Sequence, residues 1–136
     1  MEAELTYLQN GIKIFDFRHY KEDAKMGSPY NTLFQISVIS NYFSGRSRWE
    51  CDIKQLKALC EELHQMYDFK LNSTVLCDVC YGSKIAFSMD KTGHLILNGT
   101  IYSSDLEHSL TFEFKADQTA ILPFIKKLEM MIKSSE

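Results

Sequence analysis

Residues 83–102 decide the fold of this chain, and they read Ser-Lys-Ile-Ala-Phe-Ser-Met-Asp-Lys-Thr-Gly-His-Leu-Ile-Leu-Asn-Gly-Thr-Ile-Tyr. Apolar residues alternate with polar or small ones on both sides of a central Asp90-Lys-Thr-Gly93, which is the pattern of two half-buried β-strands. An aspartate at the start of such a turn bonds to its own backbone, and a glycine at its end supplies the positive φ that closes the loop. The stretch therefore predicts an antiparallel hairpin closed by Asp90 and Gly93.

Further strands extend this hairpin on both sides. Downstream, the alternation of Leu110, Phe112 and Phe114 predicts a third strand of the same meander. Residues 21–31 are polar and are expected to form a loop. Upstream, alternating or β-branched runs predict strands near residues 4–8, 12–18, 32–39, 42–49 and 74–79.

Two amphipathic helices complete the pattern, because apolar residues recur at helical spacing over 56–66 and over 121–132. Asp52 and Gln55 predict a capping box at the start of the first helix. Pro123 is expected in the first turn of the second helix, since a deeper proline would cost about 3 kcal/mol. Strands joined by short hairpins cannot form parallel crossovers. We therefore expect one α+β domain over residues 1–136, with a twisted antiparallel sheet of six to eight strands and two helices packed on one face.

The charge balance limits the kinds of partner. The formal net charge is -3, with 15 Lys and Arg against 18 Asp and Glu. This argues against a nucleic-acid binder, which normally carries a basic stripe, and it permits an acidic patch that faces a basic partner. No apolar run reaches the ~18 residues of a membrane span, and residues 1–7 do not resemble a secretory signal. We expect a cytoplasmic protein that binds neither membranes nor nucleic acid directly.

Four cysteines leave a zinc protein as an alternative. Cys60 and His64 are four residues apart on a predicted helix, and Cys77 and Cys80 have the spacing of a zinc ligand pair. The stretch around Cys77 is mostly apolar, which favours reduced core thiols, Cys51 among them, over a metal site. We therefore predict no metal and no cofactor.

The sequence offers no strong catalytic constellation. His94 lies near Asp90, and His108 lies near Asp105 and Glu107, but each group falls in a predicted turn. Ser103, Ser104 and Ser109 are nearby, yet none has the Gly-x-Ser-x-Gly context of a nucleophile elbow. We therefore expect a protein that is not an enzyme.

Arg46, Arg48 and Trp49 form a cluster that permits two interpretations. Arginines beside an aromatic ring are typical of nucleic-acid stacking sites. Strand alternation instead predicts a buried Trp49 with both arginines facing solvent, and we favour this interpretation unless Gly45 shifts the register through a bulge.

Four ordered motifs resemble the WapI-type immunity proteins of bacterial toxin–immunity systems. They are Phe43-Ser44-Gly45, Asp90-Lys-Thr-Gly93-His94, Phe112-Glu-Phe114 and Asp117-Gln118-Thr119. The similarity runs from about residue 34 to residue 132, and the cysteines are not part of it. The motif residues are expected to be structural, as turn, cap and core positions; they are Phe43, Gly45, Asp90, Gly93, His94, Phe112, Phe114, Asp117 and Gln118.

The resemblance implies a cytoplasmic immunity protein that binds and neutralises a cognate toxin domain, often a nuclease. An acidic patch would speed association with a basic cleft, and the expected partner-binding residues are Asp105, Glu107 and Glu113 of the last hairpin. Two alternatives stay open: a non-enzymatic adaptor that forms a homodimer, and the small zinc-binding protein described above.

Overall fold

The computed structural model describes all 136 residues and contains eight strands and three α-helices. The strands are β1 Ala3–Tyr7, β2 Asn10–His19, β3 Thr32–Ser40, β4 Phe43–Cys51, β5 Ser73–Cys77, β6 Lys84–Met89, β7 His94–Tyr102 and β8 Ser109–Asp117. The helices are α1 Lys21–Lys25, α2 Ile53–Tyr67 and α3 Ile121–Ser134, and a short 3₁₀ turn, η1 Gln118–Ala120, precedes α3. The α+β prediction is confirmed.

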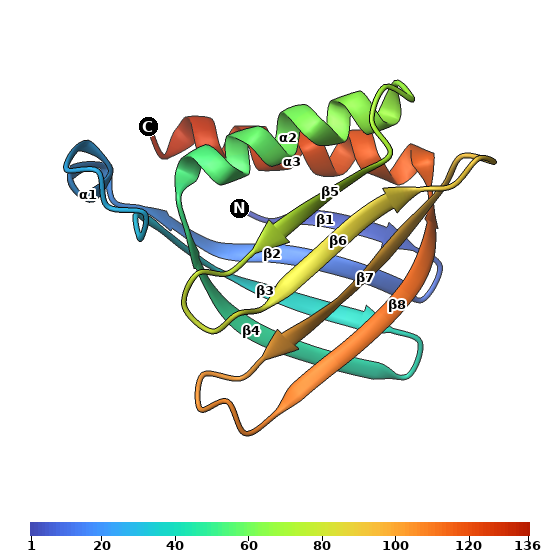
Figure 1. The fold of residues 1–136 in the computed structure, drawn as a ribbon, viewed down its shortest axis with the longest axis horizontal. Coiled ribbons are helices and arrows are strands. Elements are labelled where there is room, and N and C mark those ends of the chain that lie inside the picture. The colour runs from blue at the N-terminus through green and yellow to red at the C-terminus, as the bar shows by residue number, and fades with distance from the viewer.

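The eight strands form two antiparallel sheets and not a single one. Sheet A has the order β1-β2-β3-β4, and sheet B has the order β5-β6-β7-β8 (Figure 1). Each sheet is a simple meander in which every strand pairs with the next along the chain, and each is followed by a long helix. The chain is therefore a structural duplication of one unit, four strands and a helix.

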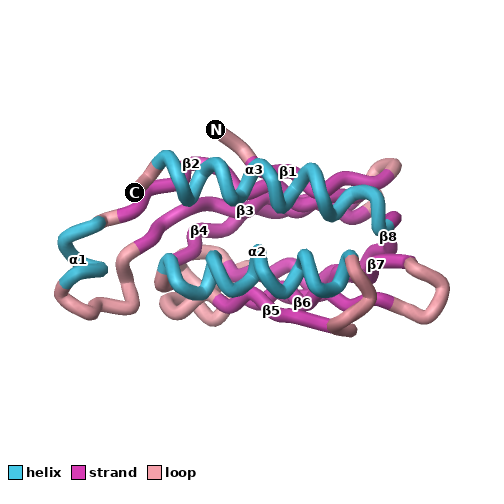
Figure 2. The backbone as a smooth tube through the Cα atoms, turned by 90° about the horizontal axis from the view of Figure 1, so that it is seen from above, coloured by secondary structure: helices cyan, strands magenta, loops and turns pink.

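The two helices cross over to the opposite sheet. Helix α2 follows sheet A but packs against β5, whereas α3 follows sheet B but packs against β1. Seen from above, α2 and α3 run side by side across the two sheets (Figure 2). Because each helix closes the other unit's sheet, neither half can bury its apolar surface alone.

One continuous core lies between the sheets and the helices, and it contains 30 buried hydrophobic residues. Strand alternation supplies the inner face of each sheet, and the helical stripes supply the rest. The rings of Phe34 and Trp49 stack at 5.9 Å, and Phe87 of sheet B meets Phe124 of α3 at 6.5 Å. The prediction that Trp49 is buried while Arg46 and Arg48 face solvent is confirmed.

Local hydrogen bonds fix the start of α2, and here the predicted capping box forms only in part. Asp52 caps the helix by accepting from the Lys54 amide at 3.0 Å, but the Gln55 side chain does not return to complete a capping box. Gln55 instead donates to the Cys77 carbonyl and accepts from the Cys77 amide, so it ties α2 to the edge strand β5. Residues 21–31, predicted as a loop, contain the five-residue helix α1.

A buried amide holds the segment before β3 against α2. Asn31 accepts from the Ile53 amide and from the Thr32 hydroxyl, each at 2.8 Å. Its amide nitrogen donates to the Ser28 carbonyl and to the Asp52 carboxylate. Asn31 therefore joins the start of β3 to the start of α2, a role that the sequence did not indicate.

None of the helices combines the length and the apolar character needed to cross a membrane.

Candidate functional site

The β6–β7 turn is organised by a single carboxylate. Asp90 accepts from the amides of Thr92 and His94, both at 2.9 Å, and from the Thr92 hydroxyl at 2.8 Å. Gly93 has φ 88°, as the sequence predicted. The Thr92 hydroxyl and then the His94 amide lower the pKa of Asp90 from 3.8 to about 2, so the carboxylate is ionised at neutral pH.

The same turn contains a hydroxyl, an imidazole and a carboxylate, but not in a catalytic arrangement. The His94 Nδ1 atom lies 2.7 Å from the Thr92 hydroxyl and 3.4 Å from the Asp90 carboxylate. A general base needs the orienting carboxylate on one ring nitrogen and the nucleophile on the other. Here the Thr92 hydroxyl and the Asp90 carboxylate both lie beside Nδ1 of His94. The three side chains therefore serve to close the turn.

Several motif residues meet at one joint between the turn and the helices. Gln118 donates to the Tyr67 carbonyl at the end of α2 at 2.7 Å. His94 pairs with Asp117 across β7 and β8, and Asp117 caps η1 through the Thr119 amide. The joint connects the end of α2, the β6–β7 turn and the start of α3.

The remaining motif residues fall into two environments. Phe112 and Phe114 are buried on the inner face of β8, with ring centroids 6.0 Å apart. Gly45 allows β4 to approach sheet B, because a Cβ there would lie 3.2 Å from a Leu110 methyl group. Phe43 differs from the others, since 70 % of its side chain is exposed at the β3–β4 hairpin tip.

The acidic residues proposed from the sequence do not form one patch. Asp105 and Glu107 share the β7–β8 turn, where the Asp105 carboxylate accepts from the Ser103 hydroxyl and from the Glu107 amide at 3.0 Å. These bonds, the hydroxyl first, lower the pKa of Asp105. Glu113 lies away from the turn, on the outer face of β8 opposite Asn98.

All three arginines of the chain gather on the outer face of sheet A. A β-bulge between Phe15 and Arg18 shifts the alternation of β2, so Arg18 faces outward on the same side as Arg46 and Arg48. All three side chains are exposed, and none forms an ion pair within the chain. We call this surface the arginine face: the outward side chains of β2, β3 and β4, centred on Arg18, Arg46 and Arg48.

Two shallow cavities hollow the arginine face and share Arg48. The larger, of 340 Å³, lies between Arg18 and Arg48, and Gln35 forms part of its floor. The smaller, of 300 Å³, has Arg46 and Arg48 of β4 on one side and Ser103, at the start of the β7–β8 turn, on the other. The acidic turn with Asp105 and Glu107 therefore borders the arginine face.

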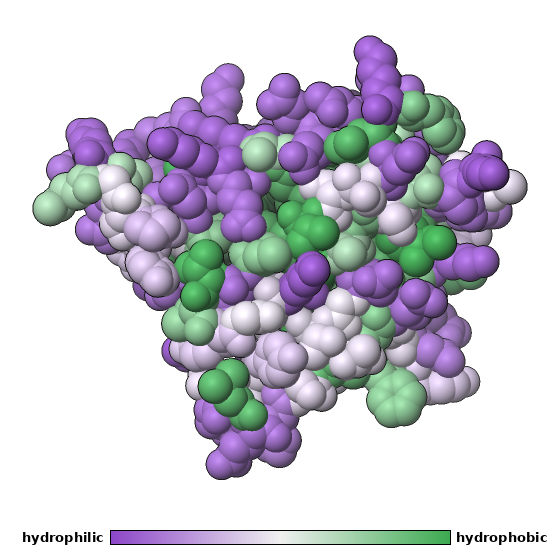
Figure 3. Space-filling view, in the orientation of Figure 1, coloured by the Kyte–Doolittle hydropathy of each residue, from purple (hydrophilic) through white to green (hydrophobic).

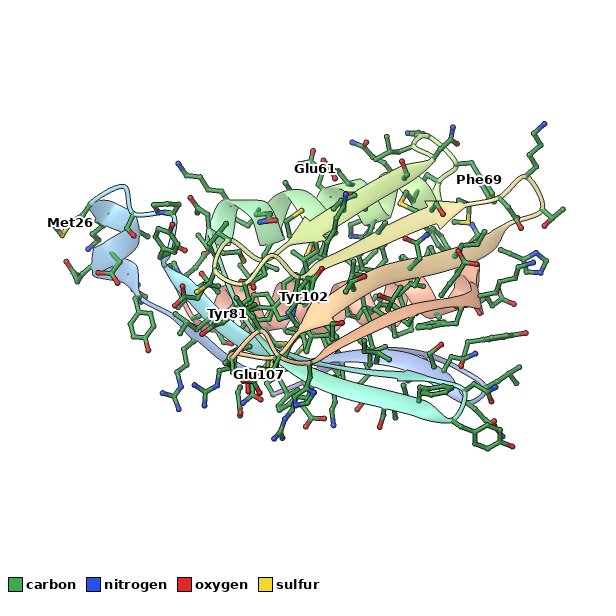
Figure 4. All side chains as sticks on the ribbon, turned by 60° about the horizontal axis from the view of Figure 1, so that its bottom comes forward. Met26, Glu61, Phe69, Tyr81, Tyr102 and Glu107 are labelled. Atoms are coloured by element: carbon green, nitrogen blue, oxygen red, sulfur yellow. The ribbon has the colours of Figure 1, made fainter.

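A buried aspartate fixes the aromatic edge of the larger cavity. The Asp78 carboxylate accepts from three backbone amides, those of Glu50, Cys80 and Tyr81, at 2.8 to 3.1 Å. This holds the β5–β6 loop against β4 and places Tyr81 in the cavity wall. Figure 4 shows Tyr81, Tyr102 and Glu107 at this end of the molecule, where several nitrogen-tipped side chains project below sheet A. This role of Asp78 was not predicted from the sequence, where only the flanking Cys77 and Cys80 were considered as site residues.

The cysteines and His64 do not converge on a common point. No group of three or more His, Cys, Asp or Glu side chains is placed to hold a metal ion. Cys51 and Cys60 are buried, and burial raises the pKa of each thiol to about 12. Cys77 and Cys80 are exposed, although most of the cysteines were expected in the core. His64 faces Glu129 of α3 at 3.3 Å.

Comparison with protein-family models gives no match to this chain, and comparison with curated proteins gives none either.

Proposed function

We propose that this chain is a non-catalytic binding protein that neutralises a cognate protein toxin, in the manner of the WapI-type immunity proteins that its four motifs resemble. The observation that carries the proposal is how the polar residues are used. The close hydroxyl, imidazole and carboxylate of Thr92, His94 and Asp90 close a turn. The exposed arginines instead gather on a broad open surface, with Tyr20 and Tyr81 in the wall of its larger cavity, and such a surface suits the binding of another protein.

The motif residues support the proposal as parts of a rigid scaffold. An inhibitor needs a stable fold that presents a preformed surface, because ordering a loose surface would cost affinity. The joint made by Gly93, His94, Asp117 and Gln118 locks the last hairpin to both long helices. Such a role places the protein in the cytoplasm of the cell that makes it, where its four unpaired cysteines would stay reduced.

The adaptor alternative has one observation in its favour. Exposed apolar residues gather at the tips of the β1–β2 and β3–β4 hairpins, and a second copy of the chain is one candidate to cover them. Sedimentation of the purified chain tests this alternative, which predicts a dimer.

The proposal is tested with the protein domain encoded beside this gene, which the proposal predicts to be the toxin. Co-expression should restore growth to cells that make the toxin domain, and the two purified proteins should form a stable complex. We expect the triple variant Asp105→Lys, Glu107→Lys, Glu113→Lys to keep its fold, because exposed charges contribute little to stability and Asp105 bonds only within its own turn. It should associate more slowly with the toxin domain, most clearly at low salt, because the acidic β7–β8 turn would attract basic groups on the toxin surface.

A matched variant controls for the change in net charge. Asp23→Lys, Glu61→Lys and Asp68→Lys alter the charge equally at exposed positions away from the last hairpin. Loss of association in both variants would indicate a nonspecific charge effect. Absence of any complex with the wild-type chain would refute the proposed function.

A further inference from the structure

We propose that the arginine face is the surface through which this chain holds an acidic protein partner, with Arg18, Arg46 and Arg48 contacting carboxylates of that partner. This inference rests on the proposed binding function and deepens it by naming the surface and the chemistry of the partner. The arginine face is the centre of the contact, and the acidic β7–β8 turn lies at its rim.

The duplicated fold provides an internal comparison, because both sheets expose one outer face. The outer face of sheet B mixes small polar residues with apolar ones such as Val75 and Ile96, and it carries two lysines, Lys84 and Lys115, but no arginine. Figure 3 shows mainly pale, weakly polar residues where β6 to β8 cross the middle of the view. Protein interfaces are enriched in arginine and aromatic residues and depleted in lysine. By that measure sheet A and not sheet B carries the interface.

The geometry of the arginines suits carboxylates. Arg48 lies opposite Gln35, and Arg18 lies opposite Leu33, so the two guanidinium groups approach the larger cavity from opposite sides of β3. A planar guanidinium binds a carboxylate through two parallel hydrogen bonds, and a partner group between Arg18 and Arg48 can contact both. The arginines have no ion pair inside the chain, so no internal contact must break before they bind.

The acidic residues on this face favour a protein over a nucleic acid. Asp16 and Glu50 line the same cavity as Arg18 and Arg48. A continuous phosphodiester backbone would meet these two carboxylates and a chain of net charge -3, both of which oppose its binding. A folded partner can place single carboxylates beside the arginines and neutral or basic groups beside the acids. Asp16 already accepts a hydrogen bond from Gln35 at 2.7 Å, so part of its hydrogen-bonding capacity is satisfied within the chain.

Apolar anchors flank the charged centre at the hairpin tips. Leu8 and Tyr42 are 85 % and 90 % exposed, and Phe43 and Ile39 lie beside them. Leu8 has φ 56°, a left-handed conformation that costs a leucine roughly 1–2 kcal/mol. The Asn41 amide donates to the Asn10 side chain at 2.7 Å and joins the two tips. The strained backbone at Leu8 exposes an apolar side chain to water, and the two hairpin tips are fixed to each other. Both features indicate that these apolar side chains contact a partner molecule.

The surface is large enough for such a contact. The three strands of the arginine face, at about 4.8 Å spacing and with about nine residues at about 3.3 Å each, give roughly 400–450 Å² before side-chain relief. The hairpin tips and the β7–β8 turn extend it toward the ~800 Å² per partner of a standard protein interface.

The experiment uses a peptide of ten glutamates as the probe of an acidic protein surface, titrated into the ¹⁵N-labelled chain. We expect saturable shifts in β2, β3 and β4 at low salt. The double variant Arg46→Gln, Arg48→Gln should weaken peptide binding at least tenfold. The matched variant Lys84→Gln, Lys115→Gln on sheet B removes the same charge and should leave peptide binding unchanged. Shifts confined to sheet B, or equal losses in the two variants, would overturn the inference.

Two further arms separate the possible outcomes. Single-stranded oligothymidine of ten residues carries a similar charge, and tighter binding of it than of the peptide would assign the arginine face to nucleic acid and overturn the inference. The toxin domain encoded beside the gene is the second arm, in which the arginine variant should lose affinity and the lysine variant should not.

Peptide binding to the arginine face without any toxin binding would refute the proposed function and leave the surface assignment standing. Toxin binding that is unchanged in the arginine variant would refute the surface assignment alone. If the double variant does not fold, Arg18→Gln and the shift map of the wild-type chain decide the same questions.

Discussion

Replacing Asn31 by alanine should destabilise this fold more than any substitution of an exposed polar residue. Asn31 is 1 % exposed, and its side chain makes four hydrogen bonds that join the start of β3 to the start of α2. The alanine variant leaves the Ile53 amide buried with no acceptor, which costs about 1–3 kcal/mol. Thr32 keeps a second partner in His19, and the Ser28 carbonyl can reach water, so these two groups add little.

Loss of the bond from Asn31 to the Asp52 carboxylate adds about 1 kcal/mol, because that carboxylate caps α2. The expected total is about 2–4 kcal/mol. For a chain of this length the melting temperature falls by about 3–4 °C per kcal/mol, so a drop of roughly 6–16 °C should accompany the change.

Urea unfolding followed by far-ultraviolet circular dichroism measures this loss. Asn72→Ala is the matched control, since Asn72 is exposed and a surface change of this kind usually stays within about 0.5 kcal/mol. Asn31→Asp keeps the acceptor but sets a second carboxylate against Asp52, so it should be unstable at neutral pH and recover partly on acidification. A loss below about 1 kcal/mol in Asn31→Ala would show that the buried amide network does not join β3 to α2 as described.

Two further predictions concern the β6–β7 turn. Gly93→Val should lower the free energy of unfolding by about 1–2 kcal/mol, because φ at this position is 88°; Gly93→Asn should cost less, and equal melting temperatures for valine and glycine would contradict this. The native pKa of Asp90, about 2 against an ordinary 3.8, means that the ionised carboxylate stabilises the fold above about pH 4. That contribution should disappear as the pH falls from about 4 to about 2. Urea unfolding at several pH values should therefore show the difference between the wild-type chain and Asp90→Asn shrinking on acidification, and a constant difference would refute the assignment.

Local chemistry in the sequence was enough to predict the elements and several site residues. The hairpin around Asp90 and Gly93 was predicted because a turn is closed by its own side chain and its own glycine. The burial of Trp49 with Arg46 and Arg48 outside followed from strand alternation. Each of these features depends on residues within a few positions of one another.

Pairing between distant segments could not be predicted in the same way. The sequence led us to expect one sheet, whereas the chain forms two sheets, with α2 between them in sequence. The β5–β6 loop also covers the edge of β4, through hydrogen bonds of Asp78 and Val79 with the Glu50 backbone. Sequence repetition did not reveal the duplicated unit, because the two halves share an order of elements and not a pattern of residues. The Gln55 side chain was assigned to a local cap and instead reaches Cys77, a partner 22 positions away.

The sequence by itself determined which residues form strands, turns and helical stripes, because these depend on spacing along the chain. Only the tertiary structure decided that three arginines share one face, since the bulge in β2 moves Arg18 outward and the sheet register then aligns it with Arg46 and Arg48. The crossing of α2 and α3 to opposite sheets was likewise a tertiary outcome. An amphipathic stripe in the sequence shows that a helix must bury one side. Which sheet the helix packs against depends on the shape of the apolar surface that the folded chain offers.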